Sequence, residues 1–310
     1  MTEARLQPDN PDHDSLTRFL LQAAGVRGVR VHLDDTWQQI RERAACSTNG
    51  KMPIAVTELL GEAAAASALF TGHAKVDGHL SVQLRGDGPL RTLFAECTAA
   101  GTLRGIAQVE EDAVLPRDLR ALGADAVLAI TIENPAIDGR EPARYQGMVA
   151  LDADSLAGAF EDYFRQSEQL PTRLLLAADG ERAAGLMLQK LPGDSGDEDG
   201  WDRAMALFET LSPQELLDWP TDTLLRRMFL QDGAQVLGVR PLRFACSCSR
   251  ERVASMLQSL GEDEAEAAAA DGVAEIRCEF CGQQYHFDAD QIADLFQPHG
   301  VEVPAPERLQ

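Results

Sequence analysis

Four of the six cysteines stand in two tight pairs near the C-terminal end of the chain. Cys246 and Cys248 are separated by one residue, Cys278 and Cys281 by two. Two such pairs can complete a four-sulfur shell around one tetrahedral ion, for which Zn²⁺ is the usual occupant. Gly282, directly after the second pair, lets the chain turn back with positive φ. The spacing predicts one zinc ion held by these four cysteines. The alternative, four buried small hydrophobic residues, fits a CxC spacing poorly.

The same thiolates are suited to redox chemistry. Zinc requires deprotonated sulfur, which is also the form that peroxide attacks. Oxidation of two of the four sulfurs removes two ligands and with them most of the metal affinity. A disulfide between Cys246 and Cys248 would close a very small, strained ring that is readily reduced again. The pattern therefore suits a reversible sensor of oxidants.

The cysteines lie in a small unit, residues 241–297, whose own elements must position them. The expected elements are a helix over 249–260, a helix or loop over 262–270, strands over 273–278 and 283–287, and a last helix opened by Asp288. A unit of about 50 residues buries little core, whereas structural zinc in small domains contributes on the order of 10–16 kcal/mol. Removal of the ion is expected to unfold the unit. Residues 298–310 are expected to form a flexible tail.

Residues 1–192 are expected to form an α+β core, because strands and helices mix without a regular βαβ period. Helices are predicted from Ser15 to Gly25, after Asp35, over 53–70 and over 155–168. Strands are predicted over 29–33, 80–84, 103–109, 126–132, 145–151, 173–177 and 185–191. The core contains no nucleophile-elbow, P-loop or HExxH pattern, so no catalytic residue is predicted.

Residues 193–240 begin with a glycine-rich acidic run that is typical of a flexible joint. Apolar residues then recur at helical spacing. They are Trp201, Met205, Phe208, Leu224, Leu225, Met228 and Phe229. The pattern fits a small helical subdomain packed on the core, or a conditional element that is stable only while its neighbours hold it.

The composition bears on partners and compartment. The formal net charge is −22, with 28 basic and 50 acidic residues, which leaves little to build a phosphate-binding face and argues against nucleic acid. The polar stretch from Met1 to Asp14 has no signal-peptide pattern. The apolar run around Leu59–Phe70 is interrupted by Gly61 and Glu62 and is expected to be too short to span a membrane. We therefore expect a cytoplasmic protein, in which paired cysteines more often bind metal or are redox-active than form structural disulfides.

Several strings closely resemble the redox-regulated 33 kDa chaperonin family (heat shock protein 33). In the cysteine unit these are the CxC and CxxC pairs at this separation and the runs CSCSRER (246–252) and CEFCG (278–282). In the core they are SVQLRGDGPL (81–90), RYQGMVAL (144–151) and EDYFRQSEQLPTR (161–173). The likeness covers nearly the whole chain.

The resemblance implies an ATP-independent holdase with an N-terminal core, a middle linker and a C-terminal zinc-binding redox switch. It implies that the reduced, zinc-bound form is inactive. It also implies that, on oxidation, Cys246 pairs with Cys248 and Cys278 with Cys281. Zinc then leaves, and the switch and linker unfold. The oxidised form is expected to dimerise and to bind unfolded proteins through the seven apolar linker residues and the uncovered core.

The remaining cysteines and two histidines are expected to play ordinary roles. Cys46 and Cys97 lie outside the motif and are interpreted as plain thiols. His286 stands close behind the second pair and could substitute as a ligand, but four cysteines already fill the shell. His299, near the tail, is expected to be solvated.

Two other functions stay open. The first is a thiol–disulfide oxidoreductase that uses Cys278 and Cys281, although this CxxC does not open a helix within a βαβ pattern. The second is a zinc-knuckle regulatory protein that binds DNA, which the negative charge disfavours.

Overall fold

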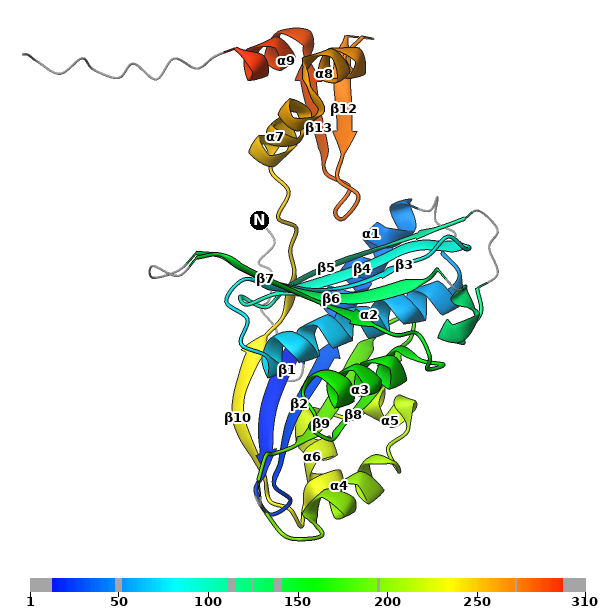
Figure 1. Cartoon of the computed structure of the whole chain (residues 1–310), viewed down its shortest axis with the longest axis vertical. Helices are drawn as coiled ribbons and strands as arrows, with labels where there is room; N and C mark the ends of the chain where they lie inside the picture. Colours follow the sequence, from blue (N-terminus) through cyan, green and yellow to red (C-terminus); the bar gives the residue numbers. More distant parts are fainter. Residues whose placement is uncertain are drawn as a thin grey trace, which may run out of the picture. The chain divides into compact units, whose positions relative to one another are not determined.

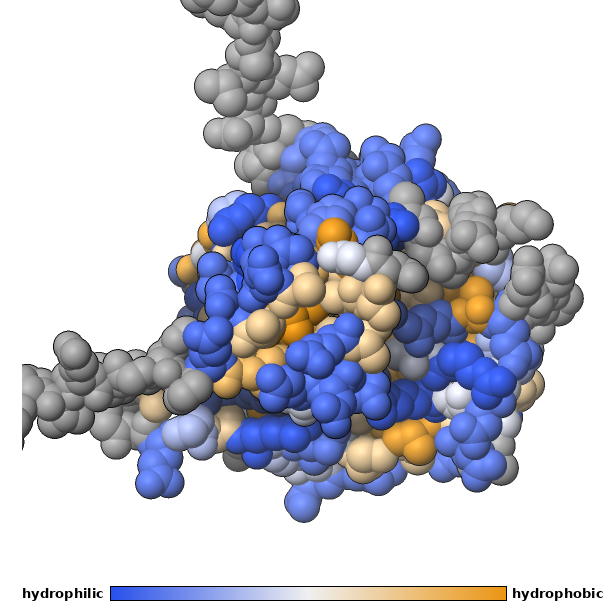
Figure 2. Space-filling model, turned by 90° about the horizontal axis from the view of Figure 1, so that it is seen from above, coloured by the Kyte–Doolittle hydropathy of each residue, from blue (hydrophilic) through white to orange (hydrophobic). Residues whose placement is uncertain are grey.

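The computed structural model describes residues 13–47, 52–110, 115–123, 125–136, 141–193, 196–270 and 272–297. The chain divides into two compact units, Met1–Cys246 and Ser247–Gln310. The first unit carries two β-sheets with helices around them, and the second carries a hairpin and three helices (Figure 1). The predicted α+β class is confirmed. Charged and polar side chains cover most of the face shown in Figure 2, with small apolar patches between them.

The first sheet has five strands in the order β10-β1-β2-β9-β8, and every neighbouring pair is antiparallel. Its strands are β1 (Ser15–Leu21), β2 (Val26–Leu33), β8 (Thr172–Ala178), β9 (Ala183–Lys190) and β10 (Ala234–Pro241). β9 is buried at every position but its last. A central strand this apolar has a packed layer on both faces of its sheet.

The second sheet has six strands in the order β11-β5-β4-β3-β6-β7. Its strands are β3 (His79–Arg85), β4 (Leu90–Thr98), β5 (Thr102–Val109), β6 (Val127–Asn134), β7 (Ala143–Val149) and β11 (Arg243–Phe244). All pairs are antiparallel except β11 and β5, which are parallel. The short strand β11 leads directly to the first cysteine pair, so this sheet anchors the chain just before that pair.

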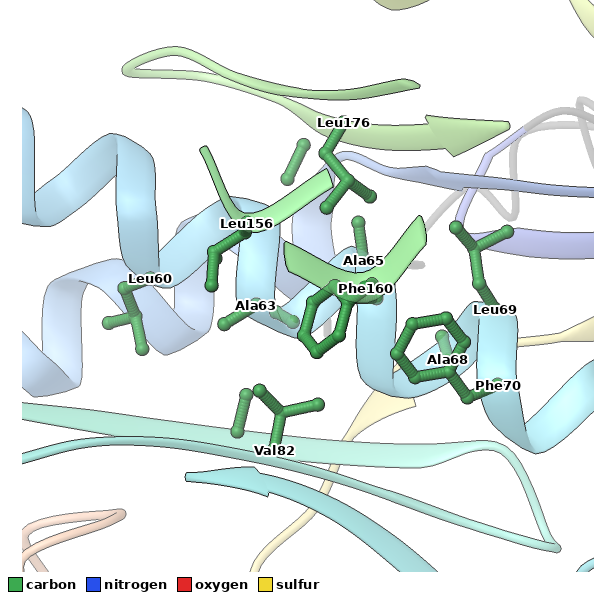
Figure 3. Packing of buried hydrophobic residues seen from close by; sticks show 14 of the residues in the cluster. Leu60, Ala63, Ala65, Ala68, Leu69, Phe70, Val82, Leu156, Phe160 and Leu176 are labelled. Atoms are coloured by element: carbon green, nitrogen blue, oxygen red, sulfur yellow. The ribbon is translucent and has the colours of Figure 1, made fainter. Parts of the chain in front are cut away.

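Helix α2 (Ile54–His73) packs against both sheets and is the centre of the main core. Figure 3 shows Val82 of β3 on one side of the helix and Leu176 of β8 on the other. Small side chains, five of them alanines between positions 63 and 68, allow both sheets to approach closely. The other helices of this core are α1 (Asp35–Ser47), the 3₁₀ turn η1 (Leu119–Leu122) and α3 (Leu156–Ser167).

Among the described residues, α2 alone is long and apolar enough to cross a membrane by length and composition. The helix is longer than the apolar run singled out in the sequence, so the expectation that this segment is too short was wrong. Most of the helix is buried between the two sheets, as in the core helix of a folded domain.

The predicted helix from Ser15 to Gly25 was wrong, because Ser15–Leu21 is strand β1. Leu16 lies in the main core, whereas Phe19 and Leu21, on the opposite face of the strand, lie in a second cluster. A strand buried on both faces has no polar alternation, so its apolar residues imitate helical spacing. The other predicted strands and helices of the core are confirmed, with ends shifted by a few residues.

Three short helices cover the face of the first sheet that is opposite α2. They are α4 (Gly200–Phe208), α5 (Pro213–Asp218) and α6 (Thr221–Phe229). Ser212 and Glu215 form a capping box at the start of α5. The helical part of the expected 193–240 segment ends near Phe229, and the chain then returns to the sheet as β10, a strand that the sequence pattern did not reveal.

The second unit folds around a single antiparallel hairpin. Its elements are α7 (Arg250–Leu260), α8 (Glu262–Ala268), β12 (Val273–Arg277), β13 (Gln284–Asp288) and α9 (Ala289–Phe296). The predicted elements of this unit are confirmed, including the cap of the last helix by Asp288 and Gln291. Its buried core is small and contains three alanines: Val253, Leu257, Ala265, Ala269, Ala274, Phe287 and Ile292.

Candidate metal centre

The first cysteine pair follows a segment that is tied to the second sheet. The backbone N–H of Ala245 donates to the carbonyl of Leu103 at 3.1 Å, which continues the β11–β5 pairing. The guanidinium of Arg43 lies over the ring of Phe244, 4.2 Å from its centroid. These contacts determine where the chain leaves the sheet, and Cys246 is the next residue.

The second cysteine of this pair lies just before α7. Ser249 caps the helix by accepting a hydrogen bond from the N–H of Arg252. The Arg252 side chain turns back and donates to the carbonyl of Ser247, between the two cysteines, at 2.8 Å. This hydrogen bond holds the start of α7 against the Cys246–Cys248 segment. A serine directly after the second cysteine of the pair is the local signal for this arrangement.

The other pair lies in the turn of the β12–β13 hairpin. Cys278 donates its N–H to the carbonyl of Gln283 at 2.9 Å, and Gly282 donates to the carbonyl of Cys278 at 2.8 Å. Gly282 has φ of +73°, as predicted, a conformation that favours glycine. The tight turn brings Cys278 and Cys281 to one side. This CxxC does not open a helix, unlike the oxidoreductase motif.

The four sulfurs of Cys246, Cys248, Cys278 and Cys281 all lie within 4.8 Å of one another. Cys248 Sγ and Cys281 Sγ are 3.3 Å apart, too far for a disulfide, whose S–S length is about 2.05 Å. Sulfurs bound tetrahedrally at about 2.3 Å lie about 3.8 Å from one another. The observed spacing brackets that value, and four soft thiolates form the donor set that zinc prefers. The cluster can therefore hold one such ion.

Two side chains donate hydrogen bonds to the first pair, and the sequence reasoning missed both. The hydroxyl of Tyr285 donates to Cys248 Sγ at 3.1 Å, and this bond is the main cause that raises the pKa of Tyr285 to about 12. Arg104 bonds Glu96 at 3.0 and 3.1 Å and also bonds Cys246. Burial alone would lower the pKa of Arg104, but these bonds outweigh burial and raise it. Tyr285 had a usable signal, because strand alternation places it on the same face as the buried Phe287.

Of the other cysteines and histidines considered in the sequence, the two whose side chains the structure describes, Cys97 and His286, are not members of the sulfur cluster. Cys97 is fully buried in β4, and burial raises the pKa of its thiol to about 11. Cys46 lies in the last turn of α1, and its side chain is outside the described part of the chain. The imidazole of His286 lies 3.7 Å from Glu275 on the paired strand and is not part of the sulfur cluster. His299 lies beyond the described residues.

The seven apolar linker residues singled out in the sequence all belong to, or pack against, one hydrophobic cluster. Six of the seven are buried, and the seventh, Trp201, is partly buried. They pack against Phe19 and Leu21 of β1 and Leu186 and Leu188 of β9, and the ring of Phe229 stacks on that of Phe19 with centroids 6.2 Å apart. In this structure the linker helices thus cover an apolar face of the first sheet and use their own apolar residues to do so.

The chain thus consists of an α+β core with a helical layer, followed by a small C-terminal unit. Four cysteines cluster at and after the start of that unit, so the class is a protein with a C-terminal thiolate module. A family model described as "Hsp33 protein" matches residues 14–288. A "33 kDa chaperonin" of Ectopseudomonas mendocina is 42% identical over 304 residues, which is 96% of this chain and 99% of the relative. One of Azotobacter vinelandii is 41% identical over 305 residues, with 96% and 99% covered.

The chain therefore belongs to the Hsp33 family, whose curated relatives are named chaperonins. The fold agrees with this assignment. The crystal structure of the 33 kDa chaperonin (heat shock protein 33 homolog) of Thermotoga maritima has a TM-score of 0.74 and 21% sequence identity, and the match covers 91% of this chain and 97% of the other.

Proposed function

We propose that this chain is an ATP-independent holdase of the cytoplasm, inactive while reduced and zinc-bound, and active after oxidation. The observation that carries the proposal is the four-sulfur cluster, three of whose cysteines belong to the second unit; among the described residues of that unit the buried core is only seven side chains, three of them alanine. A zinc ion held by these four cysteines would supply a cross-link between the two pairs. A unit with so little apolar core depends on such a cross-link for its fold.

The proposed trigger is oxidation of the ligands by a peroxide. In each pair, two thiolates give two electrons to one peroxide molecule, and the two peroxide oxygens take up two protons from the solvent. One S–S bond forms, the O–O bond breaks and two water molecules leave. The family resemblance assigns the bonds to Cys246 with Cys248 and to Cys278 with Cys281. A sulfur in a disulfide is no longer a thiolate donor, so the metal affinity of the pair is lost.

The proposed client-binding surface is the one that the linker helices now cover. Unfolding of α4–α6 would expose their apolar side chains together with Phe19 and Leu186 of the first sheet. Unfolded proteins present apolar segments that such a surface binds without ATP. We further propose, from the resemblance, that the oxidised form is a homodimer without catalytic turnover. Because the net charge is −22 and the long apolar helix α2 is mostly buried in the core, we also propose that neither nucleic acid nor a membrane is a partner.

The test combines two readings on one sample. The reduced, zinc-loaded protein is treated with peroxide at raised temperature, and zinc release and the light scattering of an unfolding client are followed together. We expect zinc release to precede suppression of client aggregation. Zinc loss without any gain in client protection would contradict the proposal.

Two controls make the outcome specific. Replacement of the buried core thiol, Cys97→Ala, should leave both readings as in the parent, because that sulfur lies outside the cluster. An insulin-reduction assay on the same samples reports oxidoreductase turnover, which the holdase lacks. Sustained turnover would favour the enzyme instead.

A further inference from the structure

The side chain of Tyr285 has a position that the proposed switch does not by itself require. It is the second residue of β13, opposite Ile276 of β12, and its ring packs against the apolar core of the second unit. Its hydroxyl ends 3.1 Å from Cys248 Sγ. Ring packing and strand pairing therefore hold one hydrogen-bond donor against one particular sulfur of the cluster.

The direction of this hydrogen bond follows from the chemistry of the two groups. A metal-binding thiolate carries no proton and can only accept. A phenol, whose ordinary pKa is about 10, is protonated at neutral pH and can donate. A donor on a thiolate draws electron density from the sulfur lone pairs, which makes the sulfur less nucleophilic and holds it in one orientation.

We propose that Tyr285 is a positioning residue that lowers the reactivity of the Cys248 thiolate toward peroxide and so sets how much oxidant the switch requires. The inference rests on the metal centre of the proposed function. The affected step is the first one: a sulfur lone pair attacks one peroxide oxygen, an S–O bond forms to give a sulfenic acid, the O–O bond breaks, and the departing hydroxide takes up one proton and leaves as water. A second thiolate then displaces the hydroxyl of the sulfenic acid, which also leaves as water after taking up a proton.

The variant Tyr285→Phe removes the donor and keeps the ring. The net contribution of one hydrogen bond corresponds to a change of about fivefold in rate. We therefore expect Cys248 in the reduced, metal-loaded variant to be oxidised by peroxide about fivefold faster than in the parent, as measured by quenched thiol labelling and peptide mass mapping. An unchanged rate at equal metal loading would overturn the proposal.

A spectroscopic reading separates this role from a merely structural one. Loaded with Co²⁺ in place of zinc, the cluster gives a sulfur-to-metal charge-transfer band whose energy falls when a sulfur loses a hydrogen bond. We expect Tyr285→Phe to shift the band to lower energy. Tyr145→Phe removes a phenol hydroxyl that bonds Tyr163 in the first unit, and it should leave both the band and the rate unchanged.

If Tyr285→Phe fails to hold the metal, 3-fluorotyrosine at position 285 provides the same test with the opposite sign. Its more acidic phenol is a stronger donor, so the band should move to higher energy and oxidation of Cys248 should slow; a band that stays in place overturns the proposal. These readings do not involve a client. A shifted band in a protein that never protects clients would refute the holdase and keep the role of Tyr285, whereas a parent that binds no Co²⁺ would refute the metal centre itself.

Discussion

A cysteine can be a metal ligand, an electron donor or an inert small side chain, and its surroundings decide which. Cys97 is buried among aliphatic side chains in β4, and burial raises the pKa of its thiol to about 11, so it stays protonated and unreactive. Cys248, in contrast, has a phenol donor and another sulfur 3.3 Å away. The same residue type thus serves packing in one unit and candidate metal binding in the other.

Glu62 is the residue for which a pH dependence is expected. Glu62 lies on α2, and its side chain is 13% exposed. The guanidinium of Arg117 is 3.8 Å from its carboxylate, but it lies closer to the carboxylate of Glu58. Burial raises the pKa of the Glu62 carboxyl to about 7. Between about pH 4.5 and 7 the folded chain therefore keeps a proton that the unfolded chain has lost, so stability falls as pH rises through this window.

We expect Glu62→Gln to remove this loss. The difference in the free energy of unfolding, variant minus parent, should be larger at pH 8 than at pH 5 by on the order of 2 kcal/mol. Urea unfolding at the two pH values measures it. Glu42→Gln, which removes an exposed carboxyl on α1, is the control, and it should show no such gain. Equal pH profiles for parent and Glu62→Gln would contradict the assignment.

At the scale of elements, a buried cation and apolar contacts together hold helices α5 and α6 on the first sheet. Arg30 of β2 is only 1% exposed. Its guanidinium donates to Thr221 Oγ1 and to the carbonyls of Trp219 and Leu216, the last at 3.4 Å. These carbonyls lie at the C-terminal end of α5, where a positive charge is favourable.

We expect Arg30→Met to loosen α5 and α6, because it leaves helix-end carbonyls without their buried donor. The free energy of unfolding should fall by roughly 2–3 kcal/mol, and limited proteolysis should cut faster between residues 209 and 221. Arg182→Met is the control: Arg182 also bonds the end of α5, at Leu217 and Asp218, but it is partly exposed, and its loss should cost less than about 1 kcal/mol. Equal losses of stability in the two variants would show that the buried hydrogen bonds of Arg30 hold the linker helices no more strongly than the partly exposed ones of Arg182.

How far the sequence predicts the structure differs between elements for physical reasons. The hairpin, the capped helices and the cysteine pairs of the second unit follow from local signals and were predicted. β1 was mistaken for a helix because both of its faces are buried, and β10 was missed because it pairs with β1, more than two hundred residues earlier in the chain. Arg104 is brought to Cys246 by the pairing of β5 with β11, which lie far apart in the sequence, whereas Tyr285 had a local signal in its alternation with Phe287, although nothing in that signal names Cys248 as its partner.

At the scale of the whole molecule, the two units differ in what holds them folded. The first unit has an extensive core built on α2 and a second cluster beneath the linker helices. The second unit has one small apolar cluster and three of the four sulfurs able to bind an ion, and the fourth is on Cys246, directly before it in the chain. Structural zinc contributes on the order of 10–16 kcal/mol in small domains, which exceeds what so small a core supplies. Loss of the metal should therefore unfold the second unit and leave the main core intact.

Hydrogen exchange of the zinc-loaded and the chelated protein, followed by peptide mass mapping, tests this account most directly. On zinc removal we predict that peptides from 247–297 lose their protection, that peptides from 200–229 become faster in exchange, and that peptides from α2 stay protected. Unchanged protection of 247–297 without zinc, or a linker that keeps its protection while that unit unfolds, would contradict the account.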